Sequence, residues 1–240
     1  MKKISSLIVL ALVLSLVGIV PTIQAAPPEP QEGKMSQEDQ QFLIEMAKSL
    51  GVKTEGKDNF AIKKEIHEVL IKKEAEKLGI KTEGKDIQKI AMEVHIAHLK
   101  EEAKTLGIET EGKDPKTLMK EVFETKITKK AKELGVKTEG KTMEQLGKEV
   151  HEKMIMAEAK KLNIKTEGKD YKQLAEEIRN NQIISKAKEL GLDTKNKDPK
   201  ELLKEMMIKH PDAAKELKLF PSYGGQIMLG KHHHKMGAHE

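Results

Sequence analysis

The stretch LGIKTEGKD, residues 78–86, decides the fold. Its phrase Thr-Glu-Gly-Lys recurs along the chain at a constant spacing of 28 residues, with no insertion or deletion. The copies begin at Thr54, Thr82, Thr110, Thr138, Thr166 and, in degraded form, Thr194. A constant period of this size is typical of a repeat array. We therefore predict six tandem 28-residue units.

Aligning the six copies on this threonine reveals apolar columns. Alanine stands seven residues before every threonine, leucine stands four before it, and an aliphatic residue stands two before it. The column eight residues after the threonine holds Ile62, Ile90, Leu118, Leu146, Leu174 and Leu202. The column twelve after it holds Ile66, Val94, Val122, Val150, Ile178 and Met206. These spacings are helical, so we expect the columns to form the core.

The residues between the helices are those that end and begin helices. Two columns, three before and two after the threonine, hold glycine in every copy except for Asn163 in the first and Asn196 in the second. Columns that vary only from glycine to asparagine predict positive φ at both places. Helix N-caps are expected four residues after each threonine, at Asp58, Asp86, Asp114, Thr142, Asp170 and Asp198. Pro115 and Pro199 follow two of these caps, where proline is preferred.

The predicted fold class is all-α, with helices of about twenty residues, for example Ile87 to Leu106. The apolar residues of this helix lie on two sides, with Ile90 and Val94 roughly opposite Leu99 and Ala103. The first half of each helix should therefore pack on the preceding helix and the second half on the following one. This predicts a zigzag or solenoid-like array of six helix-extended-loop-helix repeats.

The chain ends differ from the array. Residues 1–25 have the layout of a signal peptide, with Lys2 and Lys3 before an apolar run and cleavage expected after Ala25; an uncleaved membrane anchor is the alternative. Residues 26–35 should form a flexible leader, 36–210 the six-repeat array, 211–219 a short terminal helix and 220–240 a flexible His-rich tail. The expected location is secreted or cell-envelope associated, with no membrane contact after cleavage of the signal.

Composition limits the classes of function. The chain has no cysteine, so neither disulfides nor thiolate metal sites hold it together. Removing Lys2 and Lys3 lowers the formal charge from +5 to +3, which is only mildly basic. Aromatic residues make up 2% of the chain, which leaves few stacking platforms for single-stranded nucleic acid. No nucleophile elbow, zinc-protease helix or phosphate loop is present, so we predict that the protein is not an enzyme.

The unit AKELGV at residues 131–136, followed by Gly140, Thr142, Leu146 and Val150, resembles the helix-extended-loop-helix motif of SAP-like and Rho N-terminal-like domains. The resemblance extends over all six copies, in what reads as a secreted bacterial protein. It implies the local fold, and it implies nucleic-acid binding through basic residues around the loop. The lysines at the matching loop position are Lys57, Lys85, Lys113, Lys141 and Lys169.

Glutamate recurs eleven residues after each threonine, at Glu65, Glu93, Glu121, Glu149, Glu177 and Glu205. We expect a structural role for this column, with the carboxylates accepting hydrogen bonds from the threonine hydroxyl or the loop amides. A ladder of cation-binding carboxylates is the alternative. A second column contains His67, His95 and His151, which indicates a half-buried flank. His95 and His98 are three residues apart on one helix, as a metal-chelating pair would be.

The tail carries His232, His233, His234 and His239, with Met228 and Met236 close by. Imidazole and thioether ligands suit Zn, Ni or Cu ions, and a vector-derived tag is the competing explanation. Outside such metal capture, no cofactor is expected.

Three functions follow from the sequence. The first is a structural, adhesive or binding scaffold at the cell envelope or in the extracellular matrix, with a wall component, a matrix component or another protein as partner. The second is binding of a polyanion, either extracellular DNA or a wall polymer. The third is metal capture by the tail.

Overall fold

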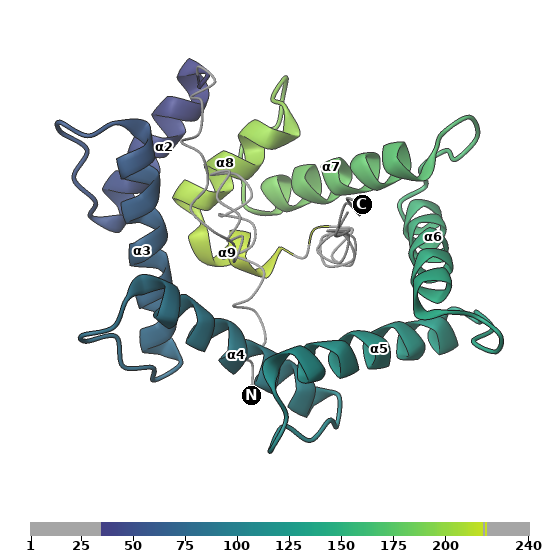
Figure 1. Cartoon of the computed structure of the whole chain (residues 1–240). Coiled ribbons are helices and arrows are strands. Elements are labelled where there is room, and N and C mark those ends of the chain that lie inside the picture. Colours follow the sequence, from purple (N-terminus) through teal and green to yellow (C-terminus); the bar gives the residue numbers. More distant parts are fainter. Residues whose placement is uncertain (1–34, 218, 220–240) are drawn as a thin grey trace, which may run out of the picture. The chain divides into compact units, whose positions relative to one another are not determined.

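The chain folds into helices alone in the part that the computed structural model describes, residues 35–217 and 219. Five helices have 19 residues each, and they are α3 (Asn59–Lys77), α4 (Ile87–Thr105), α5 (Pro115–Glu133), α6 (Met143–Lys161) and α7 (Tyr171–Glu189). The array begins with α2 (Gln37–Leu50) and ends with α8 (Pro199–Lys209) and α9 (Pro211–Glu216) (Figure 1). The predicted all-α class and repeat length are confirmed. The predicted signal peptide, most of the leader and the His-rich tail lie outside the described residues.

The described residues form two compact units. Among the described residues, the first unit contains those up to Met119 together with Leu203–Glu216, and the second contains Lys120–Leu202 with Leu217 and Leu219. The boundary therefore falls inside α5 and again inside α8.

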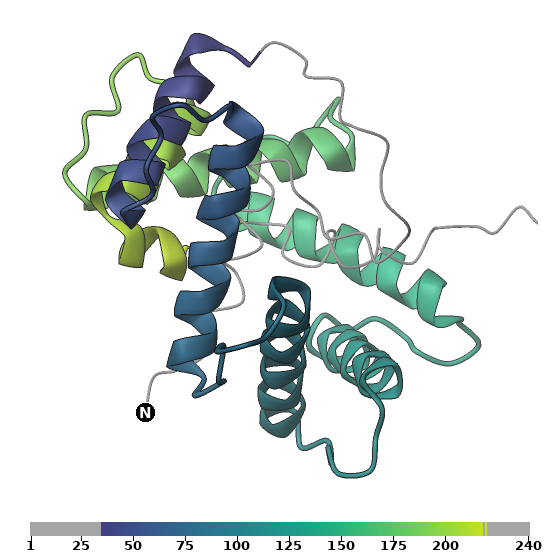
Figure 2. The ribbon, with the colours of Figure 1, turned by 60° about the vertical axis from the view of Figure 1, so that its left-hand side comes forward.

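In the first unit, α2 packs on α3 and α3 packs on α4 (Figures 1 and 2). The second half of α3 contributes Ile71 and Ala75 to a core whose other side is Ile90 and Val94, from the first half of α4. The first half of α3 instead packs on α2, where Ile62 and Ile66 join a separate core containing Phe42, Leu43, Met46 and Ala47. One helix thus serves two cores through its two halves.

The second unit repeats this arrangement. Ile127 and Ala131 of α5 pack with Leu146 and Val150 from the first half of α6. The second half of α6 contributes Ile155 and Ala159 to a different core, where they meet Leu174 and Ile178 of α7. The predicted zigzag, in which each helix packs backward with one half and forward with the other, is confirmed within each unit.

Burial follows most of the predicted columns. The alanines seven before the threonine have no exposed surface, and the columns eight and twelve after it are at most 4% exposed. The leucines four before the threonine, such as Leu78, are partly buried, and Leu78 packs against the α3–α4 core. A further column, eleven before the threonine, is fully aliphatic and buried, although only Leu99 of it was predicted to pack: Leu43, Ile71, Leu99, Ile127, Ile155 and Ile183.

Backbone conformation confirms the two glycine and asparagine columns. All twelve residues have positive φ, including Asn163 (54°) and Asn196 (58°). The predicted helix starts are confirmed as well, because the Asp58 carboxylate accepts a hydrogen bond from the Ala61 amide at 2.7 Å and Pro115 and Pro199 are first helical residues. Each repeat therefore ends one helix and starts the next with local chemistry.

Replacing Gly140 by alanine is expected to lower the free energy of unfolding by about 1–2 kcal/mol, because an L-residue is strained in the left-handed region. Gly140 has φ 72°, and an added Cβ would meet nothing within 4 Å, so the loss would be backbone strain alone. Asn163→Gly, in the other positive-φ column, should change stability by less than about 0.5 kcal/mol. Urea unfolding measures both, with exposed Lys137→Ala as the control in the same loop. An equal loss of unfolding free energy in Gly140→Ala and Lys137→Ala would contradict the explanation by backbone strain.

Candidate functional site: the repeated loop

Every loop closes its helix with the same backbone bonds. In the first loop the Val52 amide donates to the Ala47 carbonyl at 2.8 Å, and the Gly51 amide donates to the Lys48 carbonyl at 3.1 Å. This pattern satisfies the last carbonyls of the helix through a left-handed residue. The bond to the alanine carbonyl recurs at 2.8–2.9 Å in the other five copies, from Ile80, Ile108, Val136, Ile164 and Leu192. The array therefore displays one loop geometry repeatedly.

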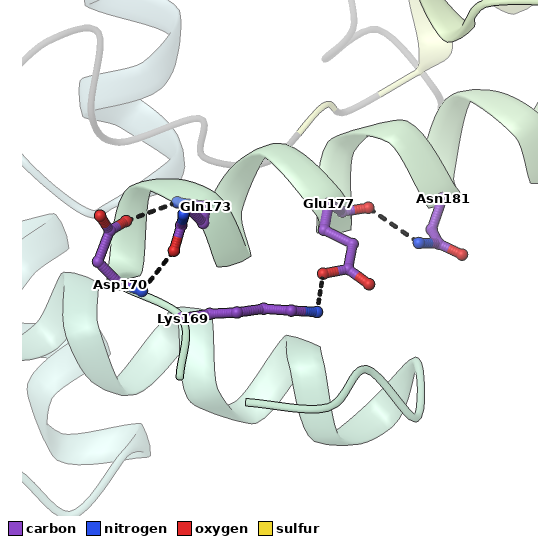
Figure 3. Close-up of polar contacts among 5 residues, drawn as sticks. All are labelled: Lys169, Asp170, Gln173, Glu177 and Asn181. Carbon is purple, nitrogen blue, oxygen red and sulfur yellow. Dashed lines mark hydrogen bonds and ion pairs between the residues drawn. The ribbon is translucent and has the colours of Figure 1, made fainter. Parts of the chain in front are cut away.

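In four copies the lysine of the Thr-Glu-Gly-Lys phrase forms an ion pair with the next helix. The Lys57 ammonium lies 2.6 Å from Glu65 Oε2, and the Lys85 ammonium lies 2.5 Å from Glu93 Oε2. The same pairing recurs between Lys141 and Glu149. It recurs again between Lys169 and Glu177, the pair that Figure 3 shows. Lys113 and Glu121 hold the same columns in the third copy. Each pair joins a loop to the helix that follows it, and partly exposed pairs of this kind contribute about 0–1 kcal/mol.

This pairing changes the interpretation of both columns. The glutamates were expected to accept from the threonine hydroxyl or loop amides, but in these four copies the partner is the lysine ammonium eight residues earlier. Four of the five lysines that the resemblance assigned to a polyanion are therefore engaged within the repeat. A phosphate or sulfate would have to displace a carboxylate to bind there.

Figure 3 shows how compactly one repeat organises its helix start. The Asp170 carboxylate accepts from the Gln173 amide at 2.8 Å, and the Gln173 side chain accepts from the Asp170 amide at 2.9 Å. This is a capping box, and Thr142 with Gln145 forms another in the preceding repeat. The Lys169 ammonium pairs with Glu177, which lies one turn beyond Gln173 on α7. The loop is thus held by its own residues.

The exposed part of the loop is its tip, whose residues were not among the predicted site residues. The residue after each threonine, a glutamate in five copies and Lys195 in the sixth, is exposed, and so is the residue just before each threonine. Four copies present a lysine there, namely Lys53, Lys81, Lys137 and Lys165, while the third presents Glu109 and the sixth Asp193. Most tips therefore offer one cation and one anion to a partner.

A shallow groove lies beside the second loop. It is lined by Lys72, Lys73 and Glu76 on α3 and by Lys81 and Glu83 in the loop, with Val69 and Ile80 between them. All five charged residues are exposed. Three lysines against two glutamates give this groove a slightly basic character.

The predicted His95–His98 metal pair does not share one environment. His98 is buried, with 4% of its surface exposed, whereas His95 is exposed. His98 Nε2 lies 3.1 Å from Glu74 Oε1 across the α3–α4 core, and Glu74 is 8% exposed. Neither atom has a hydrogen-bond partner, so the close approach of these two buried polar groups is the contact between the helices here. His98 therefore joins two helices.

Within the described residues, no group of three or more potential ligands gathers as a metal site would require. The tail histidines His232, His233, His234 and His239 lie outside those residues, so metal capture by the tail stays a prediction.

The half-buried histidine column sets an expected pH dependence. Burial lowers the pKa of His67 and of His151 below the usual value, and the neighbouring Glu68 and Glu152 oppose this shift. His95 shows the same direction of pKa shift, from burial and then from His98, but its side chain is exposed, so we rest the prediction on the other two. The unfolded chain then binds more protons than the folded chain just below the ordinary histidine pKa of about 6.5.

Stability should accordingly be complete above about pH 6.5 and decline as the pH falls toward 5. The third copy already has a phenylalanine, Phe123, in this column. Replacing both His67 and His151 by phenylalanine should therefore flatten the decline of stability with falling pH. Urea unfolding across that range measures it. The pKa of Asp114 is lowered by hydrogen bonds from Thr117, so this residue affects the pH dependence of stability only at more acid pH. An unchanged slope in the double variant would contradict the assignment.

None of the helices in the described part of the chain has the length and apolar character needed to cross a membrane. No protein-family model, curated protein or solved structure matches this chain.

Proposed function

We propose that the chain is an exported, non-enzymatic repeat scaffold that acts by multivalent binding at the cell envelope or in the extracellular matrix. The observation that carries this proposal is the repetition of one internally braced loop. Each copy uses its own cap and, in four copies, its own Lys–Glu pair to hold the loop. The loop tips present the exposed charges. Weak contacts repeated in this way add up when they act on one large partner.

The partner that fits such tips is a polymer or protein of mixed charge. A tip with one lysine and one glutamate, such as Lys81 and Glu83, carries no net charge and would pair with alternating charges. A wall component, a matrix component or another protein meets this description. Binding at any single tip would be weak, because exposed ion pairs are screened by salt.

The binding test removes the tips one after another. In the variants, lysine and glutamate are replaced by serine at the tips of one, two, three or four loops, starting with Lys53 and Glu55. Binding to native cell envelope is followed by sedimentation. We expect the apparent affinity to fall with each loop whose tip charges are removed, and the four-loop variant should bind about 10²-fold or more weakly than the unaltered protein. The control replaces Lys100 and Lys153, exposed lysines on α4 and α6 outside the loops. Loss from the control alone, or no sedimentation of the unaltered protein, would contradict the proposal.

Export has its own test. N-terminal sequencing of the protein recovered from the culture medium or envelope should begin at Ala26. Recovery only as an uncleaved chain in the membrane would favour the anchor, and recovery only inside the cell would contradict export.

Polyanion binding is the second candidate, and the groove beside the second loop favours it. Lys72, Lys73 and Lys81 line that groove and are exposed. Affinity for duplex DNA or an anionic wall polymer should then fall steeply as salt rises, and a K72E/K73E/K81E variant should lose it. Binding that is absent at low salt, or equal in the variant, would remove this candidate. A K57Q/K85Q variant is the matched control for the paired loop lysines.

A further inference from the structure

The first helix of the array departs from the repeat pattern on one face. Met46 stands eight residues before its threonine, where the other copies carry Glu74, Glu102, Lys130, Glu158 and Lys186. Asp39 stands fifteen before it, in the column that otherwise holds His67, His95, Phe123, His151 and Arg179. The first helix thus adds an apolar residue and an acid where the interior helices carry other chemistry.

The last long helix departs from the pattern in a complementary way. Its Met207 and Ile208 are apolar, and Ile208 occupies a column that is polar in four of the other copies. Lys204 is buried, with 8% of its surface exposed. The same column is exposed in each of the other five copies, at Lys64, Met92, Lys120, Lys148 and Glu176. Only a contact peculiar to the end of the array accounts for that burial.

These two faces meet each other in the first unit. Lys204 Nζ lies 2.5 Å from Asp39 Oδ1 and 5.8 Å from the centre of the Phe42 ring. Met207 and Ile208 pack against the core that Phe42 and Met46 help to form. The C-terminal part of α8 accordingly lies beside α2 in Figures 1 and 2. We call this contact the end joint, comprising Asp39, Phe42 and Met46 of α2 with Lys204, Met207 and Ile208 of α8.

The end joint is heterologous, because it pairs two different patches that every copy of the chain carries. Terminal repeats of an array ordinarily present a polar outer face, which keeps the ends from associating. Here both ends carry apolar residues and one complementary charge. The α8 patch of one chain therefore matches the α2 patch of a second chain as well as it matches its own.

We propose that the end joint is an interaction surface for a second copy of this chain. Within one chain the two patches meet at a high effective concentration, so the intrachain joint prevails in dilute solution. As the concentration rises, the α8 patch of one chain binds the α2 patch of another, giving dimers in which the partners exchange their last helices. The inference rests on α2 and α8 alone and does not depend on the proposed scaffold function.

Charge reversal isolates the interchain joint. In D39K two lysines face each other at the joint, and in K204E two carboxylates do, so neither variant closes on itself or pairs with its own kind. Mixed together, the two chains are complementary. The lysine introduced in D39K faces the glutamate introduced in K204E, and the Lys204 that the first chain keeps faces the Asp39 that the second chain keeps. The doubly reversed variant D39K/K204E regains a complementary joint within one chain.

The measurement is molar mass by light scattering during size-exclusion chromatography, at chain concentrations up to about 1 mM, the range of intramolecular effective concentrations. Each single variant should run as a monomer, and their equimolar mixture should double in mass. The unaltered protein and D39K/K204E should be monomeric when dilute and gain dimer on concentration. Helical circular dichroism equal to that of the unaltered protein shows that each variant folds. A mixture that stays monomeric, with D39K/K204E also monomeric throughout, would overturn the proposal and leave the joint as an intrachain contact.

Discussion

Replacing Ile155 by alanine is expected to lower the free energy of unfolding by about 2–5 kcal/mol and to release amide protons in α7 rather than in α5. Ile155 has no exposed surface and packs with Leu174 and Ile178 of α7, in the second half of α6. Truncation leaves a cavity between those two helices alone. Hydrogen exchange resolved by peptide mass spectrometry locates the loss.

The matched control is Leu146→Ala on the same helix. Leu146 is equally buried, but it packs with Ile127 and Ala131 of α5. This variant should lose a similar amount of stability, and its extra exchange should appear in α5. Identical exchange patterns in the two variants would show that α6 serves one shared core, contrary to the packing described above.

The second large effect concerns the buried pair between Glu74 and His98. Replacing Glu74 alone by methionine is expected to cost about 1–3 kcal/mol, because the buried His98 Nε2 would lose the carboxylate oxygen that lies 3.1 Å from it in the α3–α4 core. Lys77, 3.5 Å from Glu74 Oε2, is exposed and stays hydrated without it. Urea unfolding of E74M measures the loss.

The chain supplies its own control for this pair. The positions 28 residues earlier hold Met46 and Leu70, which pack in the α2–α3 core. Copying both into the next hairpin, as E74M/H98L, should restore stability to within about 1 kcal/mol of the unaltered protein or raise it, since apolar replacement of a buried polar pair is often neutral or stabilising. A double variant no more stable than E74M would refute this account of the pair.

Local chemistry explains why much of the fold was predictable. Asn163 and Asn196 replace glycine in their columns, which indicates that these positions require a positive φ. That requirement comes from the local chain and does not depend on distant residues. The N-caps are equally local. A strict 28-residue period then carries each local conclusion to every copy, which is why the alternating packing of helices could be predicted from one unit.

The parts that were missed depend on contacts between residues far apart or on departures from the repeat. Lys85 and Glu93 are eight residues apart and on different elements, so neither helical periodicity nor cap rules connect them. The tie between Lys204 and Asp39 joins residues 165 positions apart. Its signal lies in the columns where the first and last copies differ from the others, such as Met46, and averaging the copies into one profile removes it.

The most direct test of the alternating packing is a methyl-resolved NMR measurement of the folded protein. The Ile155 methyls should show nuclear Overhauser contacts to Leu174 and Ile178 of α7, while the Ile127 methyls should show them to Leu146 of α6. Cross-peaks joining Ile127 to Ile155 would place both halves of α6 in one common interior and would contradict the account.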